Sequence, residues 1–205
     1  MNKKKILIWV IPLTMFAIVT ILLLAGLNET FENWAYEIVS RHMSPAMNKV
    51  ATFITRRGDT ISVVLICLAL IIIPASRKTI ALPVISAVIA STVINNLLKV
   101  VFMRERPDVL RLVNETGYSF PSGHSMVSAT LYTMFAFLAY RHLKNKYLKV
   151  TISALCVIMF ISIGITRIYL GVHYAFDVLG GWFFGFAIAA FIFGIYIDKT
   201  DRKSK

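Results

Sequence analysis

Long apolar runs separated by short polar segments occupy most of this chain. An apolar segment of about 18 or more residues is long enough to cross a bilayer as a helix. Six runs approach or exceed that length, and they cover approximately residues 6–27, 60–74, 80–99, 124–140, 150–169 and 177–197. The pattern predicts an all-α fold in which residues 1–205 form one integral-membrane domain, a six-helix transmembrane bundle.

The segment between the first two runs has a different pattern. From Phe31 to Lys49, apolar side chains recur at spacings of three and four, with charged residues between them. This spacing predicts an amphipathic interfacial helix between the first and second spans. Two roles are open for residues 31–49: a structural cover over the bundle, or a side wall along which a lipid reaches a site.

The first run follows Lys3-Lys4-Lys5 and in that respect resembles a secretory signal. Its apolar stretch is longer than the ~7–15 residues of a signal core. No Ala-x-Ala cleavage motif follows it. We therefore expect this run to be retained as a membrane helix.

Composition supports the membrane assignment, and the distribution of charge orients the chain. The sequence is 58% hydrophobic and has a formal net charge of +12. With the amino terminus inside, the inner segments carry 13 basic and two acidic residues, and the outer segments carry nine basic and eight acidic residues. Because Lys and Arg in short loops stay in the cytoplasm, we predict a multi-pass protein of the cell (plasma) membrane with both termini cytoplasmic. Topology accounts for the basic excess, so no nucleic-acid partner is expected.

Histidine, acidic and basic side chains gather in three short groups at the ends of the apolar runs. Alternate crossings place the end of the third run, the start of the fourth, the end of the fifth and the start of the sixth on the outer side. All three groups therefore share the extracytoplasmic boundary, where the bundle could bring them together. In chain order the groups are Lys99 with Arg106, Ser122-Gly123-His124, and Arg167 with His173 and Asp177.

A structural role is the simpler explanation for any one of these residues, since basic side chains at helix ends reach lipid headgroups and His or Asp can cap helices. The combination favours an anion site. Pro121, Ser122 and Gly123 precede a predicted helix whose first N–H groups would face an anion. His124, in the first turn, could donate a proton. The guanidinium and ammonium groups of the other two clusters suit phosphate oxygens.

His173 and Asp177 are four residues apart, so on a helix they would share one face and the carboxylate would hold one imidazole nitrogen. The other nitrogen would then be free to attack, as in oriented-base catalysis. Gly171 suggests a break that separates Arg167 from this pair. Metal binding is the rival use of these side chains, but nearby cations would repel a divalent ion and no third close-spaced ligand is evident, so we expect no metal.

The three groups together resemble the motif set of the type 2 phosphatidic acid phosphatase family, which is shared with the vanadium haloperoxidases. The family pattern of Lys, six residues and Arg-Pro matches residues 99–107, and Pro-Ser-Gly-His matches 121–124. The third pattern, Ser-Arg, five residues, His, three residues and Asp, matches 166–177, with Thr166 in place of the serine. Size, run number and motif order are similar to those of compact bacterial members that act on phosphatidylglycerophosphate or undecaprenyl pyrophosphate.

This resemblance implies a cofactor-free, metal-independent enzyme that hydrolyses the terminal phosphate of a membrane lipid phosphate or pyrophosphate. It implies that His173 is the nucleophile that becomes phosphohistidine, that Asp177 orients it, and that His124 is the acid for the leaving group. It also implies that the phosphate oxygens, whose charge other phosphatases neutralise with a metal, are held by Lys99, Arg106, Ser122, Gly123 and Arg167.

A transporter or flippase that binds anionic lipid headgroups without hydrolysis is the alternative. Transporters commonly place polar or broken helices near the midplane, whereas the charged groups here lie at one boundary and Asn95-Asn96 is the only polar pair well inside a run. A purely structural membrane protein does not explain His173 with Asp177. The substrate's headgroup and tail, and the oligomeric state, are not fixed by the sequence.

Overall fold

The computed structural model describes residues 3–74 and 77–203, and every regular element in these ranges is helical. The predicted all-α fold is confirmed, and each of the six apolar runs corresponds to one helix. A 3-10 turn (η1, Arg56–Gly58) and a π-helical turn (η3, Arg77–Ala81) precede two of the helices. The α-helices are α1 (Lys3–Leu24), α2 (Glu29–Ser40), α3 (Pro45–Thr55), α4 (Thr60–Ile72), α5 (Leu82–Phe102), α6 (Gly123–His142), α7 (Lys146–Tyr169) and α8 (Ala175–Lys203).

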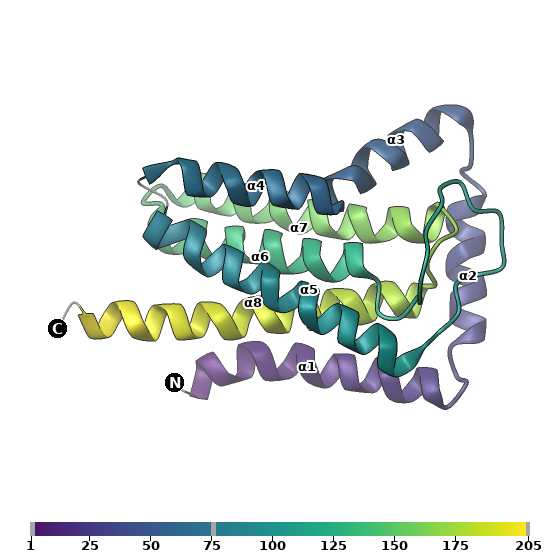
Figure 1. Cartoon of the computed structure of the whole chain (residues 1–205), viewed down its shortest axis with the longest axis horizontal. Helices are drawn as coiled ribbons and strands as arrows, with labels where there is room; N and C mark the ends of the chain where they lie inside the picture. Colours follow the sequence, from purple (N-terminus) through teal and green to yellow (C-terminus); the bar gives the residue numbers. More distant parts are fainter. Residues whose placement is uncertain (1–2, 75–76, 204–205) are drawn as a thin grey trace.

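The helices that correspond to the apolar runs, α1 and α4 to α8, lie alongside one another (Figure 1). Helix α2 crosses one end of this bundle, and the loop of residues 103–122, drawn in teal, lies at the same end. We call this the loop end. Both ends of the chain lie at the opposite end of the bundle (Figure 1). That arrangement is the one expected of a chain whose termini share one side of a membrane, although the side itself stays a prediction.

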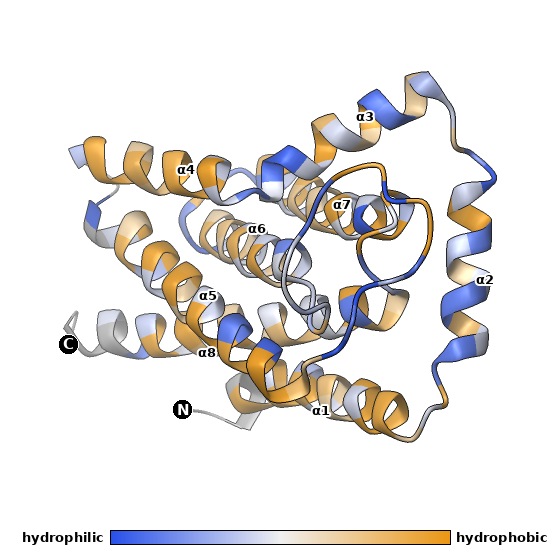
Figure 2. Ribbon diagram, turned by 45° about the vertical axis from the view of Figure 1, so that its right-hand side comes forward, coloured by the Kyte–Doolittle hydropathy of each residue, from blue (hydrophilic) through white to orange (hydrophobic). Residues whose placement is uncertain are grey.

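Four helical segments are long and apolar enough to cross a bilayer, namely Ile6–Leu24, Thr79–Phe102, Lys146–Tyr169 and Ala175–Asp198. Helix α4 is apolar but shorter, and α6 carries several buried serine and threonine residues that lower its hydropathy. The chain is therefore a membrane protein with four candidate spans, and the number six stays a prediction. Figure 2 shows the bundle helices as mainly orange, with blue positions concentrated in α2, α3 and the loop between α5 and α6.

The amphipathic segment 31–49 forms parts of two helices rather than the single predicted helix. Helix α2 ends at Ser40 and α3 begins at Pro45. A residue that precedes proline is driven out of the helical conformation, and Ser44 is accordingly extended, with φ −157° and ψ 159°. Its hydroxyl caps α3 by accepting a hydrogen bond from Met47 N at 3.2 Å. Whether either helix lies at a membrane interface stays a prediction.

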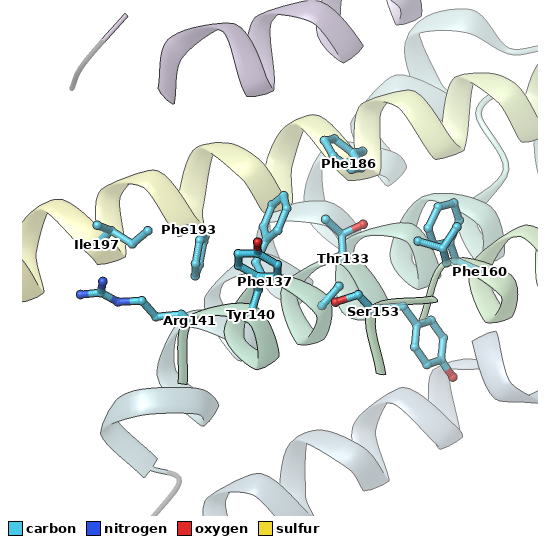
Figure 3. A pocket seen from close by; sticks show the side chains of 12 residues that line it. Thr133, Phe137, Tyr140, Arg141, Ser153, Phe160, Phe186, Phe193 and Ile197 are labelled. Carbon is cyan, nitrogen blue, oxygen red and sulfur yellow. The ribbon is translucent and has the colours of Figure 1, made fainter. Parts of the chain in front are cut away.

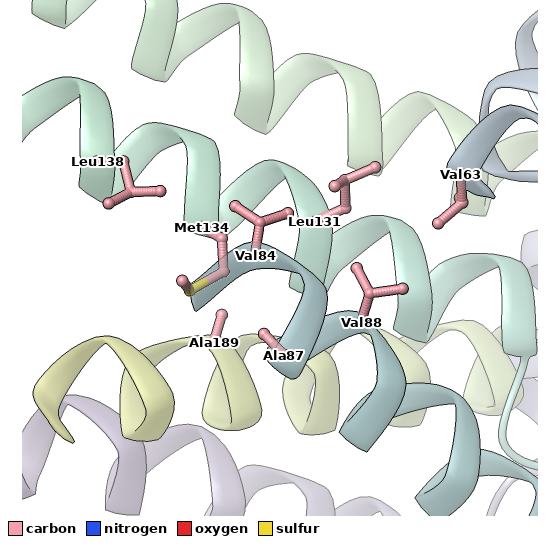
Figure 4. Packing of buried hydrophobic residues seen from close by; sticks show 8 residues of the cluster. All are labelled: Val63, Val84, Ala87, Val88, Leu131, Met134, Leu138 and Ala189. Atoms are coloured by element: carbon pink, nitrogen blue, oxygen red, sulfur yellow. The ribbon is translucent and has the colours of Figure 1, made fainter. Parts of the chain in front are cut away.

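Close packing between α6 and α8 fixes the two helices that begin at the loop end. A Cβ atom added to Gly185 of α8 would lie 2.3 Å from the Met126 carbonyl oxygen of α6, so only glycine allows this approach. Thr130 Oγ1 lies 2.9 Å from that same carbonyl oxygen and 3.0 Å from the Gly185 carbonyl oxygen. Small residues and interhelical hydrogen bonds are common means of helix association in lipid. The neighbouring apolar cluster comprises Val63, Val84, Ala87, Val88, Leu131, Met134, Leu138 and Ala189 (Figure 4).

Candidate active site

The eight predicted site residues lie near the ends of four helices and in the loop at the loop end. Gly171 makes the turn between α7 and α8, with φ +71°, and a Cβ there would lie 2.3 Å from the Leu110 carbonyl oxygen. Glycine is the residue that accepts both conditions without strain. The predicted residues are Lys99 in α5, Arg106 in the loop, Ser122, Gly123 and His124 where α6 begins, Arg167 in the last turn of α7, and His173 and Asp177 where α8 begins.

His173 lies in the turn before α8 and not on a helix with Asp177, as the spacing had suggested. Asp177 Oδ2 accepts a hydrogen bond from Tyr174 N at 2.9 Å. An acidic residue in the first helical turn commonly satisfies an N-terminal N–H group in this way. His173 Nδ1 is 3.4 Å from the same oxygen. The carboxylate faces the imidazole because the helix cap brings it there.

Two residues outside the predicted set complete the surroundings of Asp177. Ser119 Oγ donates a hydrogen bond to Asp177 Oδ2 and lies 3.2 Å from His173 Nδ1. Arg104 Nη1 donates to Asp177 Oδ1 at 2.7 Å, and the Arg104 guanidinium also binds the Glu32 carboxylate of α2 at 3.0 and 2.7 Å. Burial would lower the pKa of Arg104, but the two carboxylates outweigh it and raise that pKa. A charged arginine therefore ties α2 to Asp177.

The second nitrogen of the His173 ring faces a cation. Arg106 Nη1 is 3.3 Å from His173 Nε2 and donates to the Val172 carbonyl oxygen at 2.9 Å. Burial lowers the pKa of His173 to about 3, so the imidazole is neutral near pH 7. With the ring proton on Nδ1, beside Ser119 and Asp177, the lone pair is on Nε2.

The three predicted cations all bind one short segment of the loop, residues 115–118, which we call the covering segment. Lys99 donates one hydrogen bond to it, Arg106 donates two at 2.9 and 2.8 Å, and Arg167 donates one through Nη2. Groups that the sequence assigns to phosphate therefore hold oxygens of the protein itself. The acceptors are the carbonyl oxygens of Tyr118, Gly117 and Thr116 and the carboxylate of Glu115.

Glu115 lies between two of the arginines. Its Oε1 accepts the hydrogen bond from Arg167 Nη2, and its Oε2 is 4.0 Å from Arg106 Nη2. Burial would raise the pKa of Glu115, but the adjacent guanidinium groups hold it below its usual value. The other terminal nitrogen of Arg167 donates to Thr55 Oγ1 at 2.9 Å, and Arg167 Nε is buried without a hydrogen-bond partner among the described residues. The two arginines thus form an anion site that a carboxylate fills.

The start of α6 contributes a histidine with an acidic partner. His124 Nε2 is 2.6 Å from Asp59 Oδ1, at the start of α4. The Ser122 hydroxyl caps α6 by accepting from Ser125 N, and Ser122 N donates to the Asp177 carbonyl oxygen at 2.9 Å. Its backbone donor, which the sequence offered to an anion, is therefore used inside the protein. Phosphate contacts by Ser122 and Gly123 stay predictions.

An apolar groove of about 420 Å³ adjoins the candidate site. It reaches from His124 between α4 and α5, where Val64, Ile89 and Val93 line it. A larger groove of about 630 Å³ lies between α6, α7 and α8, and Phe137 and Phe193 line it together with other aromatic side chains (Figure 3). This larger groove is lined by none of the predicted site residues. The smaller groove is therefore the one that matters for the site.

The ordered pattern of these residues has counterparts in known proteins. The sequence profile of the PAP2 superfamily matches residues 80–201, which is more than half of the chain. The chain belongs to the PAP2 superfamily. The matched region begins just before α5 and includes all eight predicted site residues.

Curated relatives include two lipid phosphatases by name. Phosphatidylglycerophosphatase B of Bacillus subtilis (strain 168) is 38% identical over 113 residues, which cover 53% of this chain and 54% of the relative. The chain thus spans about half the length of that relative. Undecaprenyl-diphosphatase of Sulfolobus acidocaldarius is 26% identical over 213 residues, which cover 98% of this chain and 96% of the relative.

Two solved structures share the fold. The transmembrane PAP2-type phosphatidylglycerolphosphate phosphatase of Bacillus subtilis gives a TM-score of 0.78 at 28% identity, over 95% of this chain and 97% of that one. LpxE of Aquifex aeolicus gives a TM-score of 0.63 at 24% identity, over 80% of this chain and 94% of that one. The fold is therefore that of a known transmembrane PAP2-type protein.

Sequence reasoning missed several residues that contact the predicted site. Two of them lie close to motifs, and the flanking position was the only signal that could have found them. Three others precede Lys99 by 40 or more positions, and no spacing rule connects them to it. The sixth lies in the loop between the first two motifs, and no spacing rule points to it either. The missed residues are Glu32, Thr55, Asp59, Arg104, Glu115 and Ser119.

Proposed function

We propose that this protein hydrolyses the terminal phosphate of a membrane lipid phosphate or pyrophosphate, without a metal ion and through a phosphohistidine at His173. One observation carries the proposal. The imidazole of His173 has one nitrogen, Nδ1, beside Ser119 and Asp177, and the other, Nε2, 3.3 Å from Arg106. A neutral nucleophile is thus oriented next to a phosphate-binding cation, as nucleophilic catalysis requires.

The first step is attack of His173 Nε2 on phosphorus. The bond between phosphorus and the lipid oxygen breaks as the P–N bond forms, and the leaving oxygen takes a proton from His124. The imidazole becomes positively charged, and Asp177 stabilises that charge through Nδ1–H. In the second step water attacks the phosphorus of the phosphohistidine, and His124 takes back a proton from this water. The P–N bond breaks, its electron pair returns to His173 Nε2, and inorganic phosphate leaves.

Lys99, Arg106 and Arg167 supply the positive charge for the transferred phosphoryl group. Its three equatorial oxygens carry negative charge in the transition state, and fixed donors in a buried site stabilise that charge. The donors that now hold the covering segment become available when the segment moves. Arg167 Nε, buried without a partner among the described residues, adds a donor for the incoming anion.

The groove between α4 and α5 supports a lipid rather than a soluble substrate. It begins at His124, the proposed acid for the leaving oxygen. Its walls are mainly apolar and are exposed at Val64, Ile89 and Val93, although Asn95 and Asn96 also line it. An acyl or isoprenoid chain attached to the leaving oxygen would extend from His124 into this groove. Relatives named phosphatidylglycerophosphatase B and undecaprenyl-diphosphatase are consistent with such a substrate.

The decisive experiment is phosphate release by the purified protein from a panel of lipids. The panel contains phosphatidylglycerophosphate, undecaprenyl pyrophosphate, phosphatidate and diacylglycerol pyrophosphate, each with and without excess chelator. We expect release from at least one lipid, unaffected by the chelator and inhibited competitively by vanadate. Binding of these lipids without any phosphate release would favour the transporter alternative, and activity that needs added zinc or magnesium would reject the histidine mechanism.

Two variants separate the roles of the histidines. His173→Ala should abolish both turnover and the acid-labile phosphoenzyme. His124→Ala should lose most activity on a lipid ester yet keep part of its activity on nitrophenyl phosphate, whose leaving group needs no proton. His42→Ala, at an exposed position between α2 and α3, is the matched control and should behave like wild type. If His173→Ala and His124→Ala, both correctly folded, lose activity on the lipid ester and on nitrophenyl phosphate to the same extent, this division of roles is wrong.

A further inference from the structure

The turn that joins α3 to α4 contacts two of the predicted site residues, although it lies outside the region that matches the PAP2 profile. Thr55, the last residue of α3, accepts the hydrogen bond from Arg167 Nη1. Gly58 lies close to the His124 ring, since an added Cβ would be 3.5 Å from His124 Cδ2 and 2.9 Å from Ile163 Cγ2. Asp59, the next residue, reaches His124 Nε2 at 2.6 Å. This turn is therefore built against the site.

Asp59 uses its side chain for His124 and not for its own helix. It occupies the N-cap position of α4, where an aspartate normally accepts a hydrogen bond from an N–H group of the first turn. No such bond forms, and the Asp59 carboxylate points to the imidazole instead. The hydrogen bond from His124 is the main influence that holds the pKa of Asp59 below its usual value, so the carboxylate is charged near pH 7.

We propose that Asp59 is a positioning residue for the leaving-group acid: its carboxylate holds His124 Nε2–H and stabilises the protonated ring. The second ring nitrogen, Nδ1, is then the one that passes its proton to the leaving lipid oxygen and recovers it from water. This inference rests on the proposed function, because it assigns a partner to the proposed acid. It also parallels the pairing of His173 with Asp177, so each histidine of the site has its own carboxylate.

Three charged groups face His124 from the elements packed around it. Burial lowers the pKa of His124 and Arg167 lowers it further, whereas Asp59 and Glu115 oppose this shift by stabilising the protonated ring. Within the part of the chain that the structure describes, Asp59 is the one of the three that shares a hydrogen bond with the ring. Its side chain is 41% exposed, whereas that of His124 is 19% exposed. The carboxylate is thus partly screened by solvent, and its effect on the ring should be moderate.

The test compares Asp59→Asn with wild type on two substrates, a short-chain alkyl phosphate and nitrophenyl phosphate. On the alkyl phosphate we expect kcat to fall about 10- to 100-fold, a part of what a general acid contributes. The alkaline limb of the pH profile should move to lower pH by about one unit, because the protonated ring loses its counter-charge. Nitrophenyl phosphate hydrolysis should fall less than threefold (~0.6 kcal/mol).

Further variants separate a loss of the proposed role from a change in folding caused by Asp59→Asn. Asp59→Glu retains the charge and should recover part of the activity on the alkyl phosphate. Asp108→Asn makes the same substitution at an exposed position of the loop and should match wild type. Melting temperature and vanadate binding, measured on every variant, show whether the fold and the phosphate site are intact.

A double-mutant cycle decides whether Asp59 acts through His124. In a His124→Ala background, Asp59→Asn should have no further effect, because the two changes remove one function. The proposal is wrong if the losses of activity in the two single variants multiply in the double variant. It is also wrong if Asp59→Asn lowers the activity on both substrates equally and leaves the pH profile unshifted. Either result would leave the proposed function standing. Absence of phosphate release by wild type from every lipid would reject the proposed function itself.

Discussion

The covering segment gives a prediction in which a substitution at the site increases affinity. Removal of the negative charge of Glu115 should make the site bind an anion more tightly. Glu115 places its carboxylate between Arg167 and Arg106, the two arginines assigned to phosphate. An incoming phosphate or vanadate must displace this carboxylate before it can use the same donors. Glu115→Gln keeps the size of the side chain but removes its negative charge, so the displacement should become easier.

The structure sets the size of this effect. A hydrogen bond to a charged group contributes about 1.5–3 kcal/mol, and one between neutral groups about 0.5–1.5 kcal/mol. The amide of glutamine still accepts a hydrogen bond from Arg167. The free energy that an incoming anion must overcome to displace residue 115 therefore decreases by about 1–1.5 kcal/mol. The Glu115 side chain is 27% exposed, and solvent screening reduces the figure to about 1 kcal/mol. Vanadate should therefore bind roughly fivefold more tightly to Glu115→Gln.

The assay is the vanadate inhibition constant, measured for wild type and variant with the same soluble phosphate ester at pH 7. Glu105→Gln, at an exposed position of the same loop, is the matched control and should leave the constant unchanged. If vanadate binds Glu115→Gln equally or more weakly than wild type, at an unchanged melting temperature, then Glu115 does not compete for the anion site. Its role would then be to hold Arg167 in place.

Three other outcomes follow from buried charges and from topology. Arg104→Met leaves two buried carboxylates without their shared cation, which costs about 3–5 kcal/mol of stability. The melting temperature in detergent should therefore fall by roughly 10 °C. An unchanged melting temperature would contradict the charge assignment. Burial lowers the pKa of His173 to about 3, whereas an unfolded histidine titrates near ~6.5. The unfolded state thus binds more protons between these values, so stability should fall as pH drops below about 6.5, and His173→Gln should flatten that slope between pH 6.5 and 5. In a variant without native cysteines, Glu105→Cys should react with an impermeant thiol reagent on intact cells and Lys144→Cys should not; reversed labelling would place the site in the cytoplasm.

Local patterns in the sequence were sufficient for the helices and for most of their limits. Apolar runs form helices wherever they occur, because backbone groups in an apolar setting must be satisfied within the segment. Proline and glycine interrupt these helices at defined positions. The break at Gly171 follows from its positive φ. The same rule explains one error, since Pro45 divides the amphipathic segment that its periodicity alone predicted as one helix. A second error is the helical placement of His173, because α8 begins only at Ala175.

The candidate site residues of the motifs were also visible in the sequence, because imidazole and guanidinium groups gather there in an otherwise apolar chain. Their partners were not. Asp59 contacts His124 across 65 positions of sequence, and Glu32 contacts Arg104 across 72. An aspartate at the start of a helix has an obvious local use as a cap, so its sequence context predicts that use and not the contact that forms.

The sequence by itself determined the all-helical membrane fold, the family motifs and the residues that we propose to bind or attack phosphate, because these depend on residue type and short-range spacing. Only the tertiary structure decided which nitrogen of His173 lies beside Asp177, which carboxylate contacts His124, and that Glu115 lies between Arg167 and Arg106. Those features depend on distances between side chains from different helices. Helix packing sets these distances through contacts such as the one between α6 and α8 at Gly185, and no local pattern records them.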